Sequence, residues 1–397
     1  MMTEGGAQQR EEEKMDSRAL LERLIAFETV SRDSNLALIE FVRSYLAGLG
    51  VESELIYSDD GHKANLWATI GPRDQGGVIL SGHTDVVPVE GQRWTVPPFK
   101  LTQRDSKLYG RGTADMKGFI ACVLSAVPAF LASPLSRPVH IALSYDEEVG
   151  CLGVRSLIEV LQHRSPKPIA CIIGEPTQLK PILGHKGKLG VRCEVRGLAC
   201  HSAYTPDGVN AIEYAANIVV KLNEMAERLK APDLHDARFE PPHSTLQVGV
   251  IKGGQALNIV PSECSFDWEV RTLPGQNAYQ VVKEVAEYAT LILTPRMREI
   301  SAACDIHFQP LVAYPGLATE KHSEVAKLIA TLTGLQEFGT ISFGTEGGLF
   351  QQAGIPTVVC GPGCMDQGHK PDEFIEAAQL DECDTVMSNL AEYLRAR

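Results

Sequence analysis

The sequence lacks several features that would place it in a specialised class of protein. Its 397 residues carry a formal net charge of −13 and contain no basic stripe that could neutralise nucleic-acid phosphates. Residues 1–14 are polar and acidic, without the apolar segment of a secretory signal. The longest apolar-leaning run, residues 118–132, is too short to span a bilayer and contains Pro128. We therefore expect no nucleic-acid partner and no membrane partner.

Cysteine-pairing motifs are also absent. Ten cysteines are scattered along the chain without a CxxC pair or a regular framework. In a chain of this length, that pattern indicates reduced thiols, so we expect a cytoplasmic protein. The remaining composition, 44% hydrophobic and 22% charged, is ordinary for a globular protein and allows two or three domains.

The order of apolar patterns predicts an α/β fold with an inserted domain. Strand-like and helix-like runs alternate from about residue 64 to 173, which is typical of a mostly parallel sheet with helices on both faces. From about residue 185, strand, helix, two strands, helix and strand indicate an α+β sandwich. We predict a disordered N-terminus (1–15), a main domain (16–184 and 312–397) and an inserted domain (185–311). Expected helices include one that Ser17 caps and the segments 36–49, 118–131, 153–161, 209–229, 278–291, 324–334 and 377–395.

The stretch SGHTDVVP follows a short apolar run, residues 78–80, that is typical of a buried strand. His83 and Asp85 in this stretch are two positions apart, so in an extended chain they project to the same face. An imidazole and a carboxylate so placed can be a metal ligand and the partner that orients it. A buried histidine bonded to a neighbouring aspartate is the alternative for this motif alone.

Four further stretches place acids or a histidine just after apolar strands. They are LYGRGTADMKG with Asp115, DEEVG with Glu147 and Glu148, GEPT with Glu175, and GHKPDE with His369. Taken singly, they could be an N-cap, a solvated acidic turn, a turn residue before proline and a surface histidine. Together they supply mixed donors from strand-end loops of one sheet, which suit zinc, cobalt or manganese. A pair of ions would need one bridging carboxylate, which leaves one glutamate as a base.

The ordered set of these five stretches resembles the co-catalytic two-zinc hydrolases of the aminoacylase/carboxypeptidase family, from about residue 17 to the C-terminus. The resemblance implies that the main domain is the metal-binding catalytic domain. It implies that one ion is held by His83 and Glu175 and the other by Glu148 and His369. Asp115 would bridge the two ions.

The same resemblance implies roles for the acids that hold no metal. Asp85 would orient the imidazole of His83, and Glu147 would take the proton of the metal-bound water. Spacing alone does not distinguish Glu147 from Glu148, so this assignment depends on the resemblance. Gly368 stands where alanine usually precedes the ligand histidine, which enlarges the space without removing a ligand.

The inserted domain carries a second family signature, in RGLACHSAYTPDGVNAIEYA and in the stretches around Asn258 and Arg271. The resemblance implies that His201 reaches the partner subunit's site and stabilises an oxyanion. Asn258 and Arg271 would bind the substrate carboxylate. The inserted domain would then be a dimerisation or lid domain, and the protein a homodimer. A histidine that merely caps or packs at a helix start is the alternative for His201.

Three stretches favour one substrate within the family: IIGEPT followed by GHKG, the run containing His201, and FGTEGG. They indicate hydrolysis of the N-acetyl amide of N2-acetyl-L-ornithine, as in arginine biosynthesis, with two zinc ions for which cobalt can substitute. Gly344, Thr345 and Glu346 would line the substrate site, with Glu346 facing the side-chain ammonium; a helix N-cap is the alternative for Glu346. A deacylase of another N-acyl amino acid, such as succinyl-diaminopimelate, and a non-catalytic binding relative remain alternatives.

Overall fold

The computed structural model describes residues 15–395, so the predicted disorder of residues 1–15 falls almost entirely outside the described residues. The described chain divides into two compact units. Unit 1 comprises residues 15–181, 327–336 and 358–395, and unit 2 comprises residues 182–326 and 337–357. The catalytic and dimerisation roles expected for these parts of the chain remain predictions.

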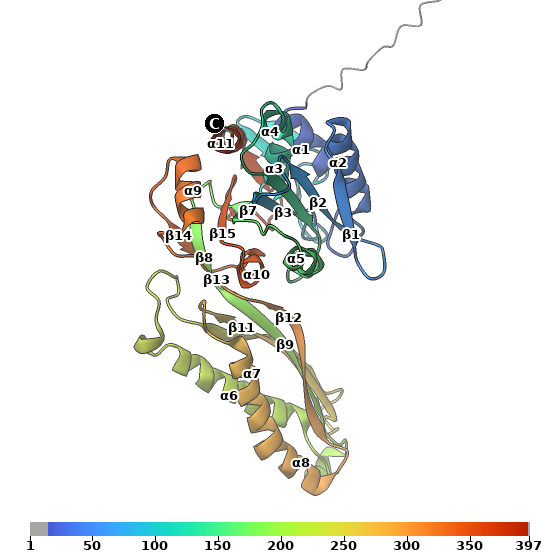
Figure 1. Ribbon diagram of the computed structural model, residues 1–397. Helices are drawn as coiled ribbons and strands as arrows, with labels where there is room; N and C mark the ends of the chain where they lie inside the picture. The colour runs from blue at the N-terminus through green and yellow to red at the C-terminus, as the bar shows by residue number, and fades with distance from the viewer. Residues whose placement is uncertain (1–14, 396–397) are drawn as a thin grey trace, which may run out of the picture. The chain divides into compact units, whose positions relative to one another are not determined.

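Unit 1 is built on a sheet with the strand order β1-β2-β6-β3-β7-β15. The central strand β3 pairs in parallel with both β6 and β7, whereas β1 and β2 form an antiparallel edge. Every residue of β3, β6 and β7 is buried, as expected where helices cover both faces (Figure 1). The predicted α/β class is confirmed. The strands are β1 (Ser53–Tyr57), β2 (Ala64–Ile70), β3 (Val78–His83), β6 (Val139–Ser144), β7 (Ala170–Pro176) and β15 (Thr357–Gly361).

The helices of unit 1 largely follow the predicted apolar patterns, with two corrections. The first helix is capped by Asp16, whose side chain accepts the Ala19 N–H, and Ser17 is its first helical residue rather than its cap. The segment 118–131 forms two helices, because Pro128 lies in the first turn of a new one, where its missing N–H is tolerated. The helices are α1 (Ser17–Ile25), α2 (Leu36–Gly48), α3 (Lys117–Ser125), α4 (Val127–Leu131), α5 (Val154–Gln162), α9 (Glu324–Thr333) and α11 (Ala377–Tyr393).

A small second sheet in unit 1 joins distant parts of the chain. Its order is β16-β5-β4, from β4 (Thr102–Arg104), β5 (Lys107–Tyr109) and β16 (Phe374–Glu376). Phe374 lies opposite Tyr109 in the antiparallel pair β16–β5. The loop before β16 and the loop after β5 are therefore neighbours, although the sequence did not predict these strands.

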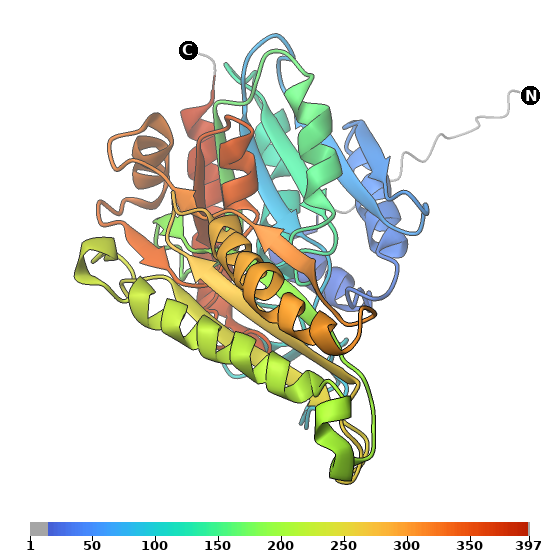
Figure 2. The ribbon, with the colours of Figure 1, turned by 90° about the horizontal axis from the view of Figure 1, so that it is seen from below.

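Unit 2 contains an antiparallel sheet with the order β10-β11-β9-β12 and helices packed on one face (Figures 1 and 2). Alternate residues of β9, such as Leu189, Val191 and Cys193, are buried in the core beneath the helices. The predicted order of strand, helix, two strands, helix and strand is confirmed. These elements are β9 (Gly187–Arg196), α6 (Ala211–Leu229), β10 (Thr245–Gly253), β11 (Glu263–Thr272), α7 (Ala278–Tyr288), α8 (Thr294–Ile300) and β12 (Asp305–Tyr314). Unit 2 also contains β8 (Ile182–His185), β13 (Leu317–Ala318), β14 (Gly339–Ile341) and α10 (Gly347–Gln352).

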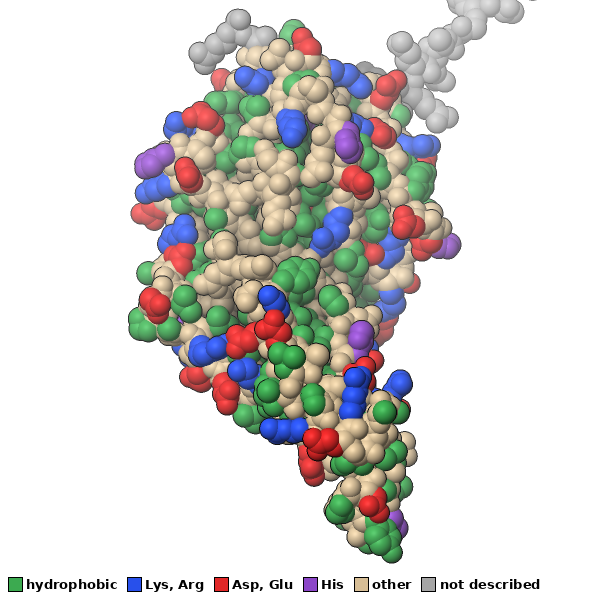
Figure 3. Space-filling model, turned by 60° about the horizontal axis from the view of Figure 1, so that its bottom comes forward, with side chains coloured by type: hydrophobic (Ala, Val, Ile, Leu, Met, Phe, Trp, Pro, Cys, Tyr) green, Lys and Arg blue, Asp and Glu red, His purple; other side chains and the backbone are tan. Residues whose placement is uncertain are grey.

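The surface carries charges of both signs. On the face shown in Figure 3, lysine and arginine side chains of the described residues are interspersed with acids rather than gathered into one stripe. None of the helices that the structure describes is both long enough and apolar enough to cross a membrane.

Candidate metal centre

His83 ends strand β3, at the carboxyl edge of the unit 1 sheet. The strand is buried throughout, and His83 itself is 1% exposed. Its Nδ1 lies 2.9 Å from the main-chain oxygen of Asp85, and its Nε2 lies 3.0 Å from Oδ1 of Asp115. One ring nitrogen is therefore tied to the main chain, while the other faces a carboxylate, as in a metal-binding histidine.

Asp115 lies between the two predicted ligand histidines. It lies in the loop after β5, two residues before α3 begins at Lys117, and is buried. Its Oδ1 faces His83, and its Oδ2 lies 3.2 Å from Nε2 of His369. A carboxylate with one oxygen toward each histidine is arranged to bridge two cations.

Two groups of potential ligands share Asp115. The first group adds His83 and Glu175, with Nε2 of His83 3.8 Å from Oε1 of Glu175. The second adds Glu148 and His369, with Nε2 of His369 3.0 Å from Oε2 of Glu148. Within each group the ligand atoms lie within 4.8 Å of one another. The structure thus brings the five predicted ligands together, and their nitrogen and oxygen donors fit zinc or cobalt.

The electrostatics of this cluster favour a cation. Burial and the charge of Asp115 raise the pKa of Glu148 to about 7, and the same two causes raise the pKa of Glu175 well above its usual range. Hydrogen bonds to Asp115 and Glu148 raise the pKa of His369 to about 10. Glu148 and Glu175 therefore ionise less readily than free glutamates, and a divalent cation in place of the His369 proton would stabilise their ionised forms.

The carboxylate of Asp85 binds a different partner from the imidazole predicted for it. Its Oδ1 accepts the main-chain N–H of Glu147 at 3.1 Å. Its Oδ2 accepts the N–H of Glu148 at 3.3 Å and the hydroxyl of Ser31 at 2.7 Å. The same side chain is 3.6 Å from Nδ1 of His83, which is too long for a hydrogen bond. Asp85 therefore holds His83 through its main-chain oxygen and the loop after β6 through its carboxylate.

Glu147 is half-buried and belongs to neither ligand group. Burial and the charge of Asp115 are the largest causes that raise the pKa of Glu175, and the charge of Glu147 is the next. Glu147 therefore lies near the first group. The thiol of Cys151 is 3.5 Å from its Oε1. A carboxylate beside the ligands, with its main chain held by Asp85, is suitably placed for a general base.

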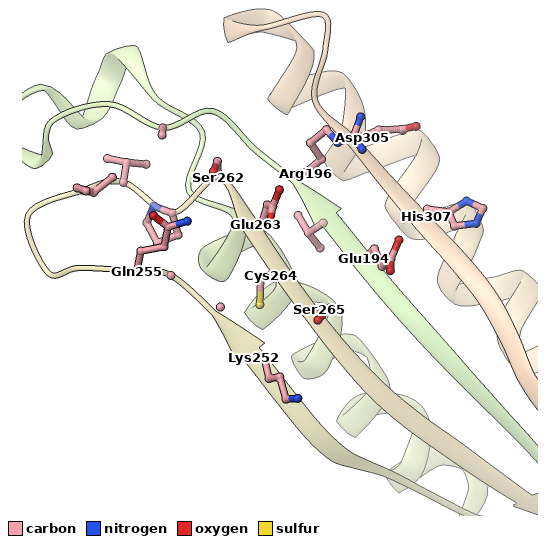
Figure 4. Close-up of a pocket in the computed structure, with 17 residues that line it drawn as sticks. Glu194, Arg196, Lys252, Gln255, Ser262, Glu263, Cys264, Ser265, Asp305 and His307 are labelled. Carbon is pink, nitrogen blue, oxygen red and sulfur yellow. The ribbon is translucent and has the colours of Figure 1, made fainter. Parts of the chain in front are cut away.

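His201 and Asn258 lie together at one end of the unit 2 sheet, and both are exposed. The N–H of Ser202 donates to the main-chain oxygen of Asn258 at 3.1 Å. Nδ1 of His201 accepts the N–H of Ala203 at 3.0 Å, so the capping alternative for this histidine is present. A pocket of about 700 Å³ lies at the same end (Figure 4). Its lining includes Arg196, Lys252, Gln255, Glu263, Asp305 and His307.

Arg271 lies near the opposite end of that sheet. Strand β11 begins at Glu263, which pairs with Arg196 at the His201 end, and runs to Thr272. The eight positions from Glu263 to Arg271 span about 26 Å at about 3.3 Å per residue. Nε of Arg271 donates to Glu269 at 3.0 Å. Within one chain, therefore, the structure does not bring Arg271 to Asn258.

Gly344, Thr345 and Glu346 precede helix α10. Thr345 and Glu346 are buried, and the Thr345 hydroxyl accepts the N–H of Gly347 at 2.9 Å. Glu346 occupies the N-cap position, but its side chain does not cap the helix. A Cβ at Gly344 would lie 2.0 Å from the ring of Tyr314, so a side chain could not fit there without a shift.

Two buried charges near the ligands were not predicted from the sequence. Arg111 and Glu373, each 1% exposed, form an ion pair in which Nη1 lies 2.6 Å from Oε2. Arg111 precedes Asp115 by four positions, and Glu373 follows His369 by four. Opposite charges that are each four positions along the sequence from a predicted ligand are the signal that could have revealed this pair.

Comparisons with known proteins agree with this geometry. The model of "Peptidase family M20/M25/M40" matches residues 79–393. An acetylornithine deacetylase of Pasteurella multocida is 36% identical over 360 residues, covering 90% of this chain and 91% of that relative.

Solved structures show the same fold. An M20 family metallo-carboxypeptidase of Sulfolobus solfataricus has a TM-score of 0.73 at 19% identity, covering 95% of this chain and 99% of that one. A dinuclear metal binding peptidase of the M20 family from Bacillus subtilis has a TM-score of 0.63 at 14% identity, covering 95% and 97%.

Proposed function

The chain belongs to peptidase family M20/M25/M40 and is a metallo-hydrolase of that family, and we propose that it hydrolyses N2-acetyl-L-ornithine to L-ornithine and acetate. The observation that carries this proposal is the position of Glu147 beside two ligand groups that share Asp115. The substrate is suggested by the 36% identical relative named acetylornithine deacetylase. The reaction would serve arginine biosynthesis.

The ligand groups fit a pair of divalent ions. His83 and Glu175 would hold one ion, Glu148 and His369 the other, and Asp115 would bridge them. We assign zinc, with cobalt as a substitute, because imidazole and carboxylate donors suit both metals. When bound, such a pair lowers the pKa of a water molecule and polarises an acyl oxygen.

Glu147 acts as the general base. It takes the proton of the attacking water and passes it to the leaving amine, so that a C–O bond forms as the amide C–N bond breaks. The Asp85 carboxylate accepts the main-chain N–H of Glu147, and this bond keeps the Glu147 carboxylate in position although it binds no ion itself.

A complete site requires a second copy of the chain. His201 would stabilise the oxyanion, and Asn258 and Arg271 would bind the substrate carboxylate. Since Asn258 and Arg271 lie at opposite ends of one sheet, they can bind the same substrate only from different subunits. Strand β10 is an edge of the described sheet, with Val250 48% and Ile251 55% exposed. These features support a homodimer formed through unit 2.

The ornithine side chain ends in an ammonium group, and we assign Glu346 as its partner, with Gly344 and Thr345 beside it. A buried carboxylate suits this role because it discriminates against uncharged side chains. No disulfide joins any of the ten cysteines, all of which lie in the described part of the chain, and this supports a reducing compartment such as the cytoplasm.

Hydrolysis of N2-acetyl-L-ornithine and of N-acetyl-L-methionine tests the proposal. We expect chelation to abolish activity, zinc or cobalt to restore it, and kcat/KM to be higher for the ornithine substrate. Glu346→Gln should lower kcat/KM for that substrate. The loss of transition-state stabilisation should be about 2–5 kcal/mol, the cost of losing one partner of a buried charge pair. The loss should be much smaller for the methionine substrate, which lacks the ammonium.

Other outcomes would lead to other conclusions. Full activity in a metal-free preparation would contradict the mechanism. A preference for N-acetylmethionine or for succinyl-diaminopimelate would indicate another deacylase. A protein that binds two ions but hydrolyses none of these substrates would favour a non-catalytic relative.

A further inference from the structure

The loops that carry Asp115 and His369 are connected by a buried carboxylate. Glu373, four positions after His369, accepts the main-chain N–H groups of Ala114 and Asp115 on its Oε1, at 2.9 and 3.1 Å. Its own main-chain oxygen accepts the N–H of Gly110 at 2.9 Å. Glu373 therefore holds the main chain at both ends of the segment 110–115, which ends at Asp115.

Arg111 and Gln92 extend this connection to His369. Arg111 pairs with Glu373 through Nη1, and its Nη2 donates to Oε1 of Gln92 at 2.7 Å. Nε2 of Gln92 donates to the main-chain oxygen of His369 at 2.9 Å. Trp94 donates to the same Gln92 oxygen at 3.1 Å, and its ring centroid lies 5.0 Å from the Arg111 guanidinium carbon. A continuous chain of hydrogen bonds thus links the main chain at Asp115 to the main chain at His369.

His369 needs such support because its φ is +60°, in the left-handed region that side chains other than glycine rarely adopt. Residues in that region keep their conformation only where the surrounding structure holds them. A buried ion pair, moreover, contributes little net stability, because desolvation offsets the attraction. The pair Arg111–Glu373 is thus better explained by the positions that it imposes on its neighbours than by stability.

We propose that Gln92, Arg111 and Glu373 are positioning residues that set the places of Asp115 and His369 and thereby the affinity for the two ions. The proposal rests on the metal pair assigned above. Glu373 acts on Asp115, which belongs to both ligand groups, so its loss weakens both ions. Gln92 acts on His369, which belongs to one group, so its loss weakens one ion.

The experiment is a zinc titration of the full-length protein against a chromophoric chelator, with Glu373→Gln and Gln92→Leu beside the wild type. Changes behind metal ligands cost about 10- to 100-fold in affinity. We expect that loss in both binding steps for Glu373→Gln, and in one step only for Gln92→Leu. Matched controls are Glu376→Gln, at the end of the following strand β16, and Gln103→Leu on exposed strand β4, and both should bind zinc as the wild type does.

Thermal melting of the metal-free proteins separates positioning from stability. Metal-free Gln92→Leu should remain folded and melt only slightly below the wild type, because it removes one hydrogen-bond partner of Arg111 while the pair with Glu373 remains. Wild-type zinc affinity in Gln92→Leu, or equal losses in both of its binding steps, would overturn the proposal. That variant decides the question by itself if Glu373→Gln fails to fold. A wild type that binds two ions but does not hydrolyse acetylornithine would contradict only the proposed substrate, because the titration needs no substrate.

Discussion

At the scale of single residues, two adjacent glutamates have different surroundings. Oε2 of Glu148 lies 3.0 Å from Nε2 of His369, within the second ligand group. Glu147 contacts Cys151 instead and belongs to neither group. The preceding residue, Asp146, has a φ of +56°, so the chain turns sharply just before the pair. Two neighbours in one acidic run can therefore serve as a base and as a ligand.

Substitution of each glutamate tests this division of roles. We expect Glu147→Ala to keep both ions and to lose about 10²–10⁴ in kcat, the usual contribution of a general base. Glu148→Ala should instead lose one ion. Metal content measured on both variants, together with kcat on N-acetylornithine, checks the assignment.

The opposite pattern, with metal lost from Glu147→Ala and retained in Glu148→Ala, would mean that the two roles are exchanged. Equal metal loss in both variants would leave no residue of this run as the base.

The ligand residues could be predicted from the sequence, but their supports could not. Each ligand lies at the end of an apolar strand, shortly after one or in a glycine-rich turn, and the local pattern reveals that. The pair Arg111–Glu373 joins residues 262 positions apart, and the Asp85 carboxylate bonds a loop 62 positions later. Such contacts depend on how strands order themselves in the sheet, which no local pattern specifies.

At the scale of elements, the long strands and helices were predictable because each has a buried face with a clear period. The sheet β16-β5-β4 was not predictable, since its strands are three residues long and too short to show a period. That sheet nevertheless sets the Asp115 and His369 loops beside each other. A short sheet that the sequence did not predict therefore aligns the Asp115 and His369 loops.

One carboxylate also joins three elements of unit 1. Asp85, just after β3, binds Ser31 before α2 and both glutamates after β6. We expect Asp85→Asn to lower kcat by roughly tenfold to a hundredfold, because a small displacement of the base is costly. Zinc held by His83 and Glu175 should be retained, because the main-chain oxygen that bonds His83 survives the substitution. Parallel measurements of kcat and zinc content check this prediction.

Ser31→Ala is the matched control, because it removes only one of the three bonds to the Asp85 carboxylate. Its effect on kcat should be smaller than that of Asp85→Asn. Loss of the ion from Asp85→Asn would instead show that the carboxylate acts through His83, as the sequence analysis supposed.

At the scale of the whole molecule, the two units contain different sets of predicted site residues. Unit 1 contains all the predicted metal ligands and Glu147, whereas unit 2 contains His201, Asn258 and Arg271. The sequence predicted an inserted domain at residues 185–311 from the order of its elements, and its catalytic and dimerisation roles stay predictions. In the structure, Asn258 and Arg271 lie about 26 Å or more apart along one sheet. The sequence could not predict this separation, because the spacing of the two residues does not show where the loop at Asn258 lies relative to strand β11.

That separation leads to a prediction about assembly. If one site draws His201 and Asn258 from one subunit and Glu147 from its partner, then His201→Ala and Glu147→Ala dimers should each be inactive. Mixed dimers of the two variants would contain one site with both substitutions and one with neither. With random exchange, half of the dimers are mixed and each has one intact site, so about a quarter of the wild-type activity should return. Dual affinity tags verify exchange, and N-acetylornithine hydrolysis measures recovery. If no activity returns after verified exchange, each site must take Glu147 and His201 from the same chain. In such a self-contained site, Arg271 would have to bind the carboxylate without Asn258.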